Sequence, residues 1–219
     1  MKKLFSVLII LILLAGLIFL LYPTVANYWN TTQQSNMVTK YVENVSQLKQ
    51  EEYDMILSEA RSYNDRLAKT GFRKYVFSEN ELEYYEGQLN VNGDGMMGYV
   101  DIPSINVHLP IYHGSNEAVL QFAAGHIEWS SLPVGGKGSH TVISGHRGVP
   151  SAKLLSNIDQ LEKGDIFFLH VLNETLAYMV QDMYTVLPED TSHLMIEGQH
   201  DYCTLITCTP FGVNTHRLL

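Results

Sequence analysis

Long clusters of basic residues are absent from this chain. The 14 Lys and Arg residues are outnumbered by 23 Asp and Glu residues, which gives a formal net charge of -9. Proteins that bind nucleic acid usually carry a basic patch, so this charge balance argues against nucleic acid as a partner. Charged residues are only 17% of the chain, whereas hydrophobic residues are 46%, enough for one packed domain with an N-terminal extension.

Cysteine is also scarce, since the chain contains only Cys203 and Cys208. Two cysteines in an exported protein would ordinarily suggest a disulfide. If both lie on one strand, their Cα atoms are roughly 16 Å apart at ~3.3 Å per residue, and the odd separation points them to opposite faces. Bridged Cα atoms lie within about 7 Å of each other. We therefore expect a free thiol at Cys208 and a small buried apolar side chain at Cys203.

Internal repeats, low-complexity tracts and metal-ligand patterns are missing as well. The chain has nine histidines, but none stands at the tight Cys/His spacing of a zinc site. We expect no metal and no other cofactor. We interpret four of the histidines as surface or hydrogen-bonded structural residues: His108, His113, His126 and His140.

A long uncharged apolar run is present at the N-terminus, where residues 4–21 follow Lys2 and Lys3. This run has the length of roughly 17–25 residues that a bilayer core requires. It is longer than the ~7–15 apolar residues of a typical signal peptide. We expect residues 1–22 to be a membrane anchor, with the lysines in the cytoplasm and the rest of the chain outside the cell membrane. A cleavable signal is the alternative, because residues 24–26 weakly resemble a cleavage site.

The rest of the chain divides into three segments. Residues 23–35 are polar and are interpreted as a linker. Residues 36–95 are interpreted as a helical extension, because apolar side chains recur at helical spacing over 36–68 and predict one or two amphipathic helices. Residues 71–95 show no clean period, and a loop of this length is usually functional or disordered. Residues 96–219 form the main domain.

Residues 96–219 contain many short β-branched or alternating runs separated by Gly and Pro clusters. This pattern predicts a mainly β fold, a closed or nearly closed barrel. The candidate strands are residues 97–102, 106–111, 139–144, 165–171, 203–208 and a long strand or bent pair over 176–186.

The run DYCTLITCTP at residues 201–210 carries the strongest chemical signal. Ile and Thr favour strands and proline stops a ladder, so Cys208 is expected to end a strand. The segments SGHRG at residues 144–148 and NTHRLL at residues 214–219 add an imidazole and a guanidinium beside other probable strand ends. An imidazole favours the reactive thiolate and can protonate a leaving amine. A guanidinium can stabilise an oxyanion.

The sequence TLITC at residues 204–208 resembles the TLxTC signature of the sortases. Further segments resemble the pilus-building subgroup, class C, and the resemblance runs from about residue 97 to the last residue. These segments are GYVDIP at 98–103, LPIYHG at 109–114, SSLPVGG at 130–136 and SGHRG at 144–148.

This resemblance implies an eight-stranded closed sortase-type β-barrel with short helices and an N-terminal helical extension. It assigns the nucleophile to Cys208, the acid–base role to His146 and the oxyanion or substrate clamp to Arg217. It implies cleavage of an LPXTG-like sorting signal between Thr and Gly, a thioester intermediate, and transfer to a lysine of the next pilin subunit. The implied partners are pilin subunits that bear such signals, the pilin lysine and the membrane.

The resemblance also implies a lid within residues 71–95. The family's Asp-Pro-aromatic anchor is missing, because this chain has no proline between residues 23 and 103. Phe72, Tyr75 and Phe77 are the aromatic candidates to replace it. We predict that this loop is mobile and closes the site only loosely.

Several alternatives stay open from the residues alone. The same site suits a sortase that anchors surface proteins to the cell-wall peptidoglycan, or a thiol protease that hydrolyses its thioester. A non-enzymatic, membrane-tethered β-domain scaffold predicts an inert, buried Cys208. Arg147 is the rival to Arg217. Ser144, Thr207 and Thr209 are candidates for the walls of the site.

Overall fold

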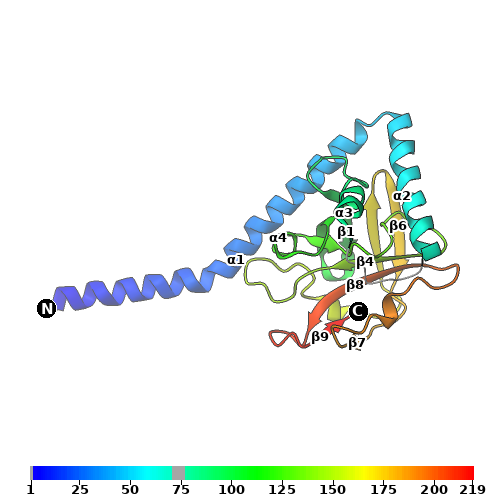
Figure 1. Cartoon of the computed structure of the whole chain (residues 1–219). Coiled ribbons are helices and arrows are strands. Elements are labelled where there is room, and N and C mark those ends of the chain that lie inside the picture. The colour runs from blue at the N-terminus through cyan, green and yellow to red at the C-terminus, as the bar shows by residue number, and fades with distance from the viewer. Residues whose placement is uncertain (1, 71–76) are drawn as a thin grey trace.

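The computed structural model describes residues 2–70 and 77–219. A long N-terminal helix and a shorter one form a bent arm, and a twisted β-sheet fills the space between them (Figure 1). The helices are α1 Lys2–Ser46, α2 Gln50–Thr70, α3 Glu79–Glu86 and α4 Glu117–Leu120. The strands are β1 Met96–Ile102, β2 Val107–His113, β3 Ala124–His126, β4 Ser139–Ser144, β5 Ile166–Val171, β6 Glu174–Met179, β7 Thr185–Val186, β8 Asp201–Thr209 and β9 His216–Leu218.

The nine strands of the described chain form one sheet in the order β6-β5-β1-β2-β3-β4-β8-β9-β7. The β2–β3 and β4–β8 pairs are parallel, and the other pairs are antiparallel. The expectation of a closed eight-stranded barrel was wrong. The sheet has nine strands, and no hydrogen-bonded pairing joins its outer strands β6 and β7 within the described residues.

The sheet stays open because the predicted long strand over residues 176–186 divides in two. Its first half is β6, which pairs with β5. The Val180 N–H still donates to the Asp165 carbonyl at 2.8 Å, after which the chain leaves β5. Its second half is β7, which pairs with the far edge of β9. The bent-pair form of the prediction is therefore the one observed.

The remaining predicted strands are confirmed within a few residues, but β3 was missed. β3 is only three residues long, and its sequence Ala-Gly-His shows no alternation. Gly125 is needed there because a Cβ atom would lie 2.2 Å from the Gly114 carbonyl oxygen, closer than any side chain allows. Glycine weakens a strand signal in sequence, although here it allows two backbones to approach closely.

α1 is a single continuous helix from Lys2 to Ser46 that includes Pro23. The segment 23–35, expected to be a linker, is therefore helical. Its hydroxyl groups bond to carbonyls four residues back, as from Thr31 to Asn27 at 2.9 Å, so they are satisfied within the helix. The Gln34 amide donates to the Phe122 carbonyl at 2.7 Å, so the polar character of this segment serves its contact with the domain.

The amphipathic helices predicted over residues 36–68 are confirmed by the second half of α1 and by α2. Their apolar faces pack on one side of the sheet with α3. Tyr41 fastens α1 to the sheet. Its ring is fully buried, and its hydroxyl donates to the Met97 carbonyl at 2.9 Å and accepts from the Leu172 N–H at 2.8 Å. A second apolar cluster lies within the curved sheet.

The expected lid segment, residues 71–95, is only partly described, and the candidates Phe72 and Tyr75 lie outside the described residues. From Ser78 onward the segment contains the helix α3, although no helix was predicted there, and its mobility stays a prediction. α3 begins with a capping box formed by Ser78 and Glu81, which satisfies the first backbone N–H groups. Tyr85 at the end of α3 is 1% exposed and stacks on Phe77, at 6.2 Å between ring centroids.

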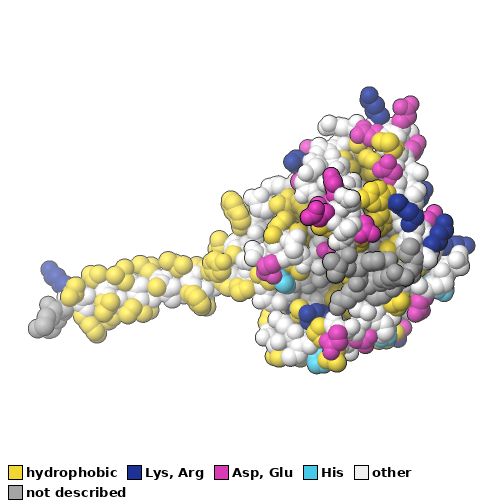
Figure 2. Space-filling model, viewed as in Figure 1, with side chains coloured by type: hydrophobic (Ala, Val, Ile, Leu, Met, Phe, Trp, Pro, Cys, Tyr) yellow, Lys and Arg dark blue, Asp and Glu magenta, His cyan; other side chains and the backbone are white. Residues whose placement is uncertain are grey.

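The first half of α1 projects away from the domain as a rod covered with exposed apolar side chains (Figure 2). It contains the one window in the described residues that is long and apolar enough to cross a membrane, with a mean hydropathy of 3.3 and none of it buried. Such a helix has the length and composition of a membrane anchor.

Candidate active site

Cys208 lies at the end of β8, one residue before the strand stops, as predicted from the proline that follows. On one side β8 pairs with β9, and the Cα atoms of Cys208 and Arg217 are direct partners across this ladder. Directly opposite residues in an antiparallel pair hold their Cβ atoms about 4.5–5.5 Å apart. The sheet therefore places the thiol and the guanidinium stem side by side.

His146 comes from the strand on the other side of β8. β4 and β8 run parallel in register as far as Ser144 and Ile206, and the Gly145 N–H extends the ladder by donating to the Ile206 carbonyl at 3.0 Å. His146 and Cys208 each lie two residues beyond the last register pair. Paired parallel strands run in the same direction, so residues two positions beyond the same register pair lie at the same end of the sheet. His146 and Cys208 are therefore neighbours at that end.

A buried hydroxyl fixes this arrangement. Thr207 is 1% exposed and donates from Oγ1 to the Gly145 carbonyl at 2.8 Å. The bond ties the residue before the thiol to the residue before the imidazole. Thr207 was expected to line the site, but its hydrogen bond shows that it locks the two strand ends together. Ser144 and Thr209 are half-buried on β4 and β8, beside the candidate residues.

Glu117 is the residue of this site that the sequence did not reveal. Its Oε2 lies 3.1 Å from His146 Nε2, and it comes from the short helix α4 between β2 and β3. The carboxylate is 71% exposed, so the ion pair is weak, but it can still orient the ring. No local pattern links residue 117 to residue 146, because tertiary structure alone brings them together.

Arg217 and Arg147 have different environments. Arg217 is half-buried, and its Nη1 donates to the His216 carbonyl at 3.1 Å and, more weakly, to the Asn214 carbonyl at 3.4 Å. Arg147 is engaged elsewhere, since its guanidinium pairs with Asp159 and lies over the ring of Phe211. This leaves Arg217 as the arginine beside the thiol. Among the described residues, no hydrogen bond directly joins the side chains of Cys208, His146 and Arg217.

Cys203 lies at the opposite end of β8 and packs against the apolar cluster within the sheet. Burial, with a smaller effect from Asp201, raises the pKa of its thiol far above the usual range. Cys203 is therefore a neutral thiol at physiological pH and a poor nucleophile. Both cysteines are free thiols.

A cavity of ≈ 440 Å³ also lies at the Cys203 end of the sheet. Its lining includes Tyr178, Cys203 and Leu218, and none of the three candidate catalytic residues. The cavity is therefore a cleft lined by residues of β6 and β8 and does not include the candidate site.

The other histidines have structural environments. His126 is fully buried: its Nε2 donates to the Ser131 carbonyl at 2.8 Å, and its Nδ1 accepts from the Tyr85 hydroxyl at 2.8 Å. Burial lowers the pKa of His126 to about 3, so the ring is neutral. In the part of the chain that the structure describes, no group of three His, Cys, Asp or Glu side chains is arranged to hold a metal ion.

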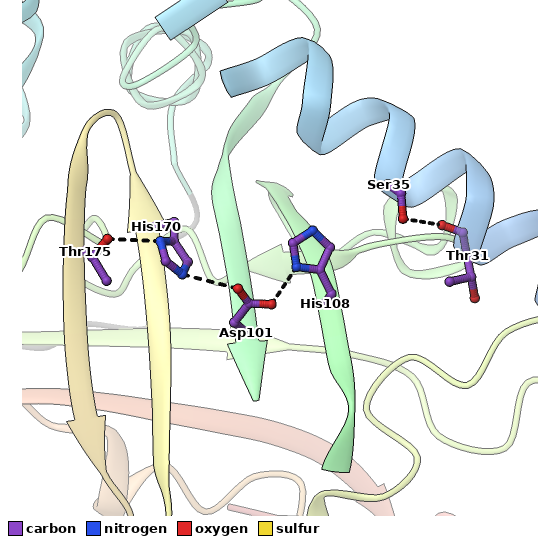
Figure 3. A network of polar contacts seen from close by, with 6 residues as sticks. All are labelled: Thr31, Ser35, Asp101, His108, His170 and Thr175. Atoms are coloured by element: carbon purple, nitrogen blue, oxygen red, sulfur yellow. Dashed lines mark hydrogen bonds and ion pairs between the residues drawn. The ribbon is translucent and has the colours of Figure 1, made fainter. Parts of the chain in front are cut away.

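A second polar network lies on the sheet away from Cys208 (Figure 3). Asp101 of β1 bridges two imidazoles on its neighbouring strands, with Oδ1 at 2.5 Å from His108 Nδ1 and Oδ2 at 3.3 Å from His170 Nε2. His170 Nδ1 also bonds to Thr175 Oγ1 at 3.0 Å, and Tyr99 stacks on the His170 ring. The network ties β2, β1, β5 and β6 together across the sheet.

Fold and site together define a β-rich domain with a free thiol at a strand end, next to an imidazole and a guanidinium. Residues 100–219 match the family model of the sortase domain, which is more than half of the chain. The chain therefore belongs to the sortase family of cysteine transpeptidases.

The solved structures that resemble it include several class C sortases. Sortase C1 from Streptococcus agalactiae is 44% identical, with a TM-score of 0.81, over 84% of this chain and 94% of that one. Sortase C from Clostridium perfringens, solved with the C-terminal cell wall sorting motif, is 38% identical, with a TM-score of 0.73, over 84% of this chain and 95% of that one. Among curated proteins, sortase A of Listeria monocytogenes is 27% identical over 96% of this chain and 86% of its own length.

Proposed function

We propose that this chain is a membrane-anchored class C sortase that joins pilin subunits through isopeptide bonds. The observation that carries the proposal is the register of the sheet, which brings the ends of β4, β8 and β9 together at His146, Cys208 and Arg217. The similarity to class C structures, one of them solved with a cell wall sorting motif, supports the choice of substrate.

In the first half-reaction, the sulfur of Cys208 attacks the threonine carbonyl carbon of an LPXTG-like signal. A carbon–sulfur bond forms, and the carbonyl oxygen takes the negative charge beside the Arg217 guanidinium. When the tetrahedral intermediate collapses, the Thr–Gly bond breaks, and His146 protonates the departing glycine amine. The threonine remains on the enzyme as a thioester.

In the second half-reaction, the ε-amine of a pilin lysine attacks the thioester carbonyl. His146 accepts the proton that the amine loses, and the Cys208 thiolate leaves. The product is an isopeptide bond between two subunits. Each step exchanges one acyl bond for another, so the reaction needs no cofactor and no external source of energy.

The apolar half of α1 supports a membrane location with the catalytic domain outside the cell. The lysines at positions 2 and 3 then remain on the cytoplasmic side. A catalytic domain in this position meets subunits after their export, as assembly of a surface polymer requires.

A sorting-signal peptide and an amine acceptor test the proposal. We expect the wild-type chain in detergent to form a covalent adduct with an LPXTG-like peptide, detected as an intact-mass increase that hydroxylamine reverses. Cys208→Ala should give no adduct, and the matched control Cys203→Ala should retain substantial activity. An adduct on Cys208→Ala, or a well-folded Cys203→Ala chain without activity, would refute the assignment.

The similarity to curated proteins named sortase A favours a second candidate function, attachment of surface proteins to the cell wall. The two functions share the thioester and differ in the amine that resolves it. Competition between a pilin lysine peptide and a cell-wall amine for the preformed thioester separates them. We expect the lysine peptide to be preferred.

A further inference from the structure

α1 contacts the loop that carries the candidate imidazole. This loop, residues 145–157, follows β4 and is here named the histidine loop. The Asn30 side chain donates to the Ser151 carbonyl at 2.8 Å, and Asn27 Oδ1 accepts from the Lys153 N–H at 2.9 Å. Residues three apart on a helix lie on one face, so the two amides grip the loop from the same side of α1.

The histidine loop in turn contacts the loop that follows the candidate nucleophile. This second loop, residues 210–215, joins β8 to β9 and is here named the cysteine loop. The Phe211 ring lies under the Arg147 guanidinium, whose Cζ is 5.6 Å from the ring centroid. A Cβ atom at Gly148 would be only 3.1 Å from Phe211 Cζ. The cysteine loop therefore packs on the histidine loop, which is itself hydrogen-bonded to α1 at Asn27 and Asn30.

The position of this contact along α1 sets its height above a membrane. The apolar run ends at residue 21, and Asn27 and Asn30 follow six and nine residues later. At ~1.5 Å per helical residue, they lie roughly 9–14 Å beyond the end of the run. A headgroup layer is roughly 5–8 Å thick on each side of the hydrocarbon core. The histidine loop is thus held close to the lipid surface, and α1 leaves the domain on this side (Figure 1).

The side chains exposed in this region fit such a surface. On α1, Tyr28 is 75% exposed and Trp29 is 64% exposed, and on the cysteine loop Phe211 is 61% exposed and Val213 is 65% exposed. Tyr and Trp are enriched at membrane interfaces, because a ring with a polar edge fits the headgroup layer. Of the nearby acidic groups, Asp159 is paired with Arg147, which reduces its repulsion from anionic lipid, whereas Glu117 lies exposed beside His146.

We propose that Tyr28, Trp29, Phe211 and Val213 form a lipid-contacting face, which holds the Cys208 end of the sheet against the outer surface of the bilayer. The proposal rests on the membrane anchoring in the proposed function. It goes further by stating which end of the domain faces the lipid. The scissile bond of a substrate must then be presented within roughly one headgroup thickness of the membrane, so substrates that are themselves tethered to the membrane are favoured.

Site-directed spin labels on the full-length chain in liposomes of phosphatidylcholine and phosphatidylglycerol test this face. In a background with Cys203→Ala and Cys208→Ala, one cysteine is introduced at a time, as Val213→Cys, Asn173→Cys or Leu11→Cys. Oxygen dissolved in lipid and a water-soluble nickel chelate report the depth of each label. We expect Val213 to contact lipid, whereas Asn173, exposed on the turn between β5 and β6, should contact only water.

The label at Leu11 tests the membrane anchoring separately from the lipid-contacting face. If Leu11 lies deep in lipid while Val213 is as water-accessible as Asn173, the anchor stands and the lipid-contacting face is refuted. If Leu11 is also in water, the anchoring and the face both fail.

A separate experiment tests the hydrogen bonds of Asn27 and Asn30 to the histidine loop. Asn27→Ala combined with Asn30→Ala should leave liposome binding intact and raise the water accessibility of the Val213 label severalfold. Asn36→Ala, a matched exposed position on the same helix, should leave the label unchanged. An unchanged Val213 label in the double variant would show that the two amides do not orient the domain.

Discussion

Lowering the pH from about 7.5 to about 5 is expected to destabilise the domain through His126. This ring is fully buried as a neutral imidazole whose two nitrogens are both satisfied, by Tyr85 and Ser131. Burial lowers its pKa to about 3, whereas an unfolded histidine titrates near its usual value of about 6.5. Below that value the unfolded chain binds the proton more readily than the folded chain, so the free energy of unfolding falls with pH.

The size of the effect follows from the two pKa values. One proton taken up only by the unfolded chain costs about 1.4 kcal/mol per pH unit, which is about 2 kcal/mol between pH 6.5 and 5. Burial also lowers the pKa of His113 and His140, so their contributions have the same sign. The bonds of Glu81 to Ser78 lower the pKa of that carboxyl, so its titration does not mask the effect in this window.

Urea unfolding of the full chain in detergent, followed by near-ultraviolet circular dichroism across this pH range, measures the loss. His126→Gln should reduce the slope of stability against pH by about one proton, even if it lowers stability at every pH. His200→Gln, at an exposed position, is the matched control and should leave the slope unchanged. A wild-type stability that does not fall towards pH 5, or an unchanged slope in His126→Gln, would refute the reasoning.

Three further predictions concern the candidate site. Thr207→Val should lower the free energy of unfolding by about 1–3 kcal/mol, because it leaves a buried carbonyl unpaired, and it should also slow acylation. Thr207→Ser keeps the hydroxyl and should restore both stability and rate; an equal loss in the serine variant would argue against the hydrogen bond. Glu117→Ala should slow acylation no more than about fivefold, since an exposed ion pair is worth at most ~1 kcal/mol; a far larger loss in single-turnover assays would make Glu117 part of the chemistry. Arg217→Lys should slow acylation by roughly 10²–10³, as the loss of an oxyanion donor does elsewhere, while iodoacetamide still alkylates Cys208; full activity would reduce Arg217 to a generic charge.

Much of the β domain was predictable because its signals are local. Several of the β-branched runs are short and end near Gly or Pro, and β8 in particular ends one residue after Cys208, just before Pro210. The segment around Arg217 was expected beside a strand end, and in the structure Arg217 lies on β9 directly opposite Cys208. These features depend on neighbours in sequence, which a pattern can report.

The features that were missed depend on tertiary contacts. Residues 23–35 are polar and contain a proline, which suggested a linker, yet bonds from Asn30 and Gln34 to distant carbonyls keep them helical on the domain surface. Glu117 approaches His146 only after α4 has packed beside β3. Whether the sheet closes depends on how β6 and β7 are placed in three dimensions, and no alternation pattern contains that information.

β4 and β8 are neighbours in the sheet although 62 residues separate Gly145 from Thr207 in the chain. Closing so long a loop reduces the entropy of the chain before the β4–β8 contacts can stabilise it, and such non-local pairing slows folding. During synthesis β4 is completed well before β8, because the 62 residues between Gly145 and Thr207 must be added first. The candidate thiol and imidazole therefore come together only after this long loop has closed, so a partly folded chain in which β8 is not yet paired with β4 lacks the arrangement of the candidate site.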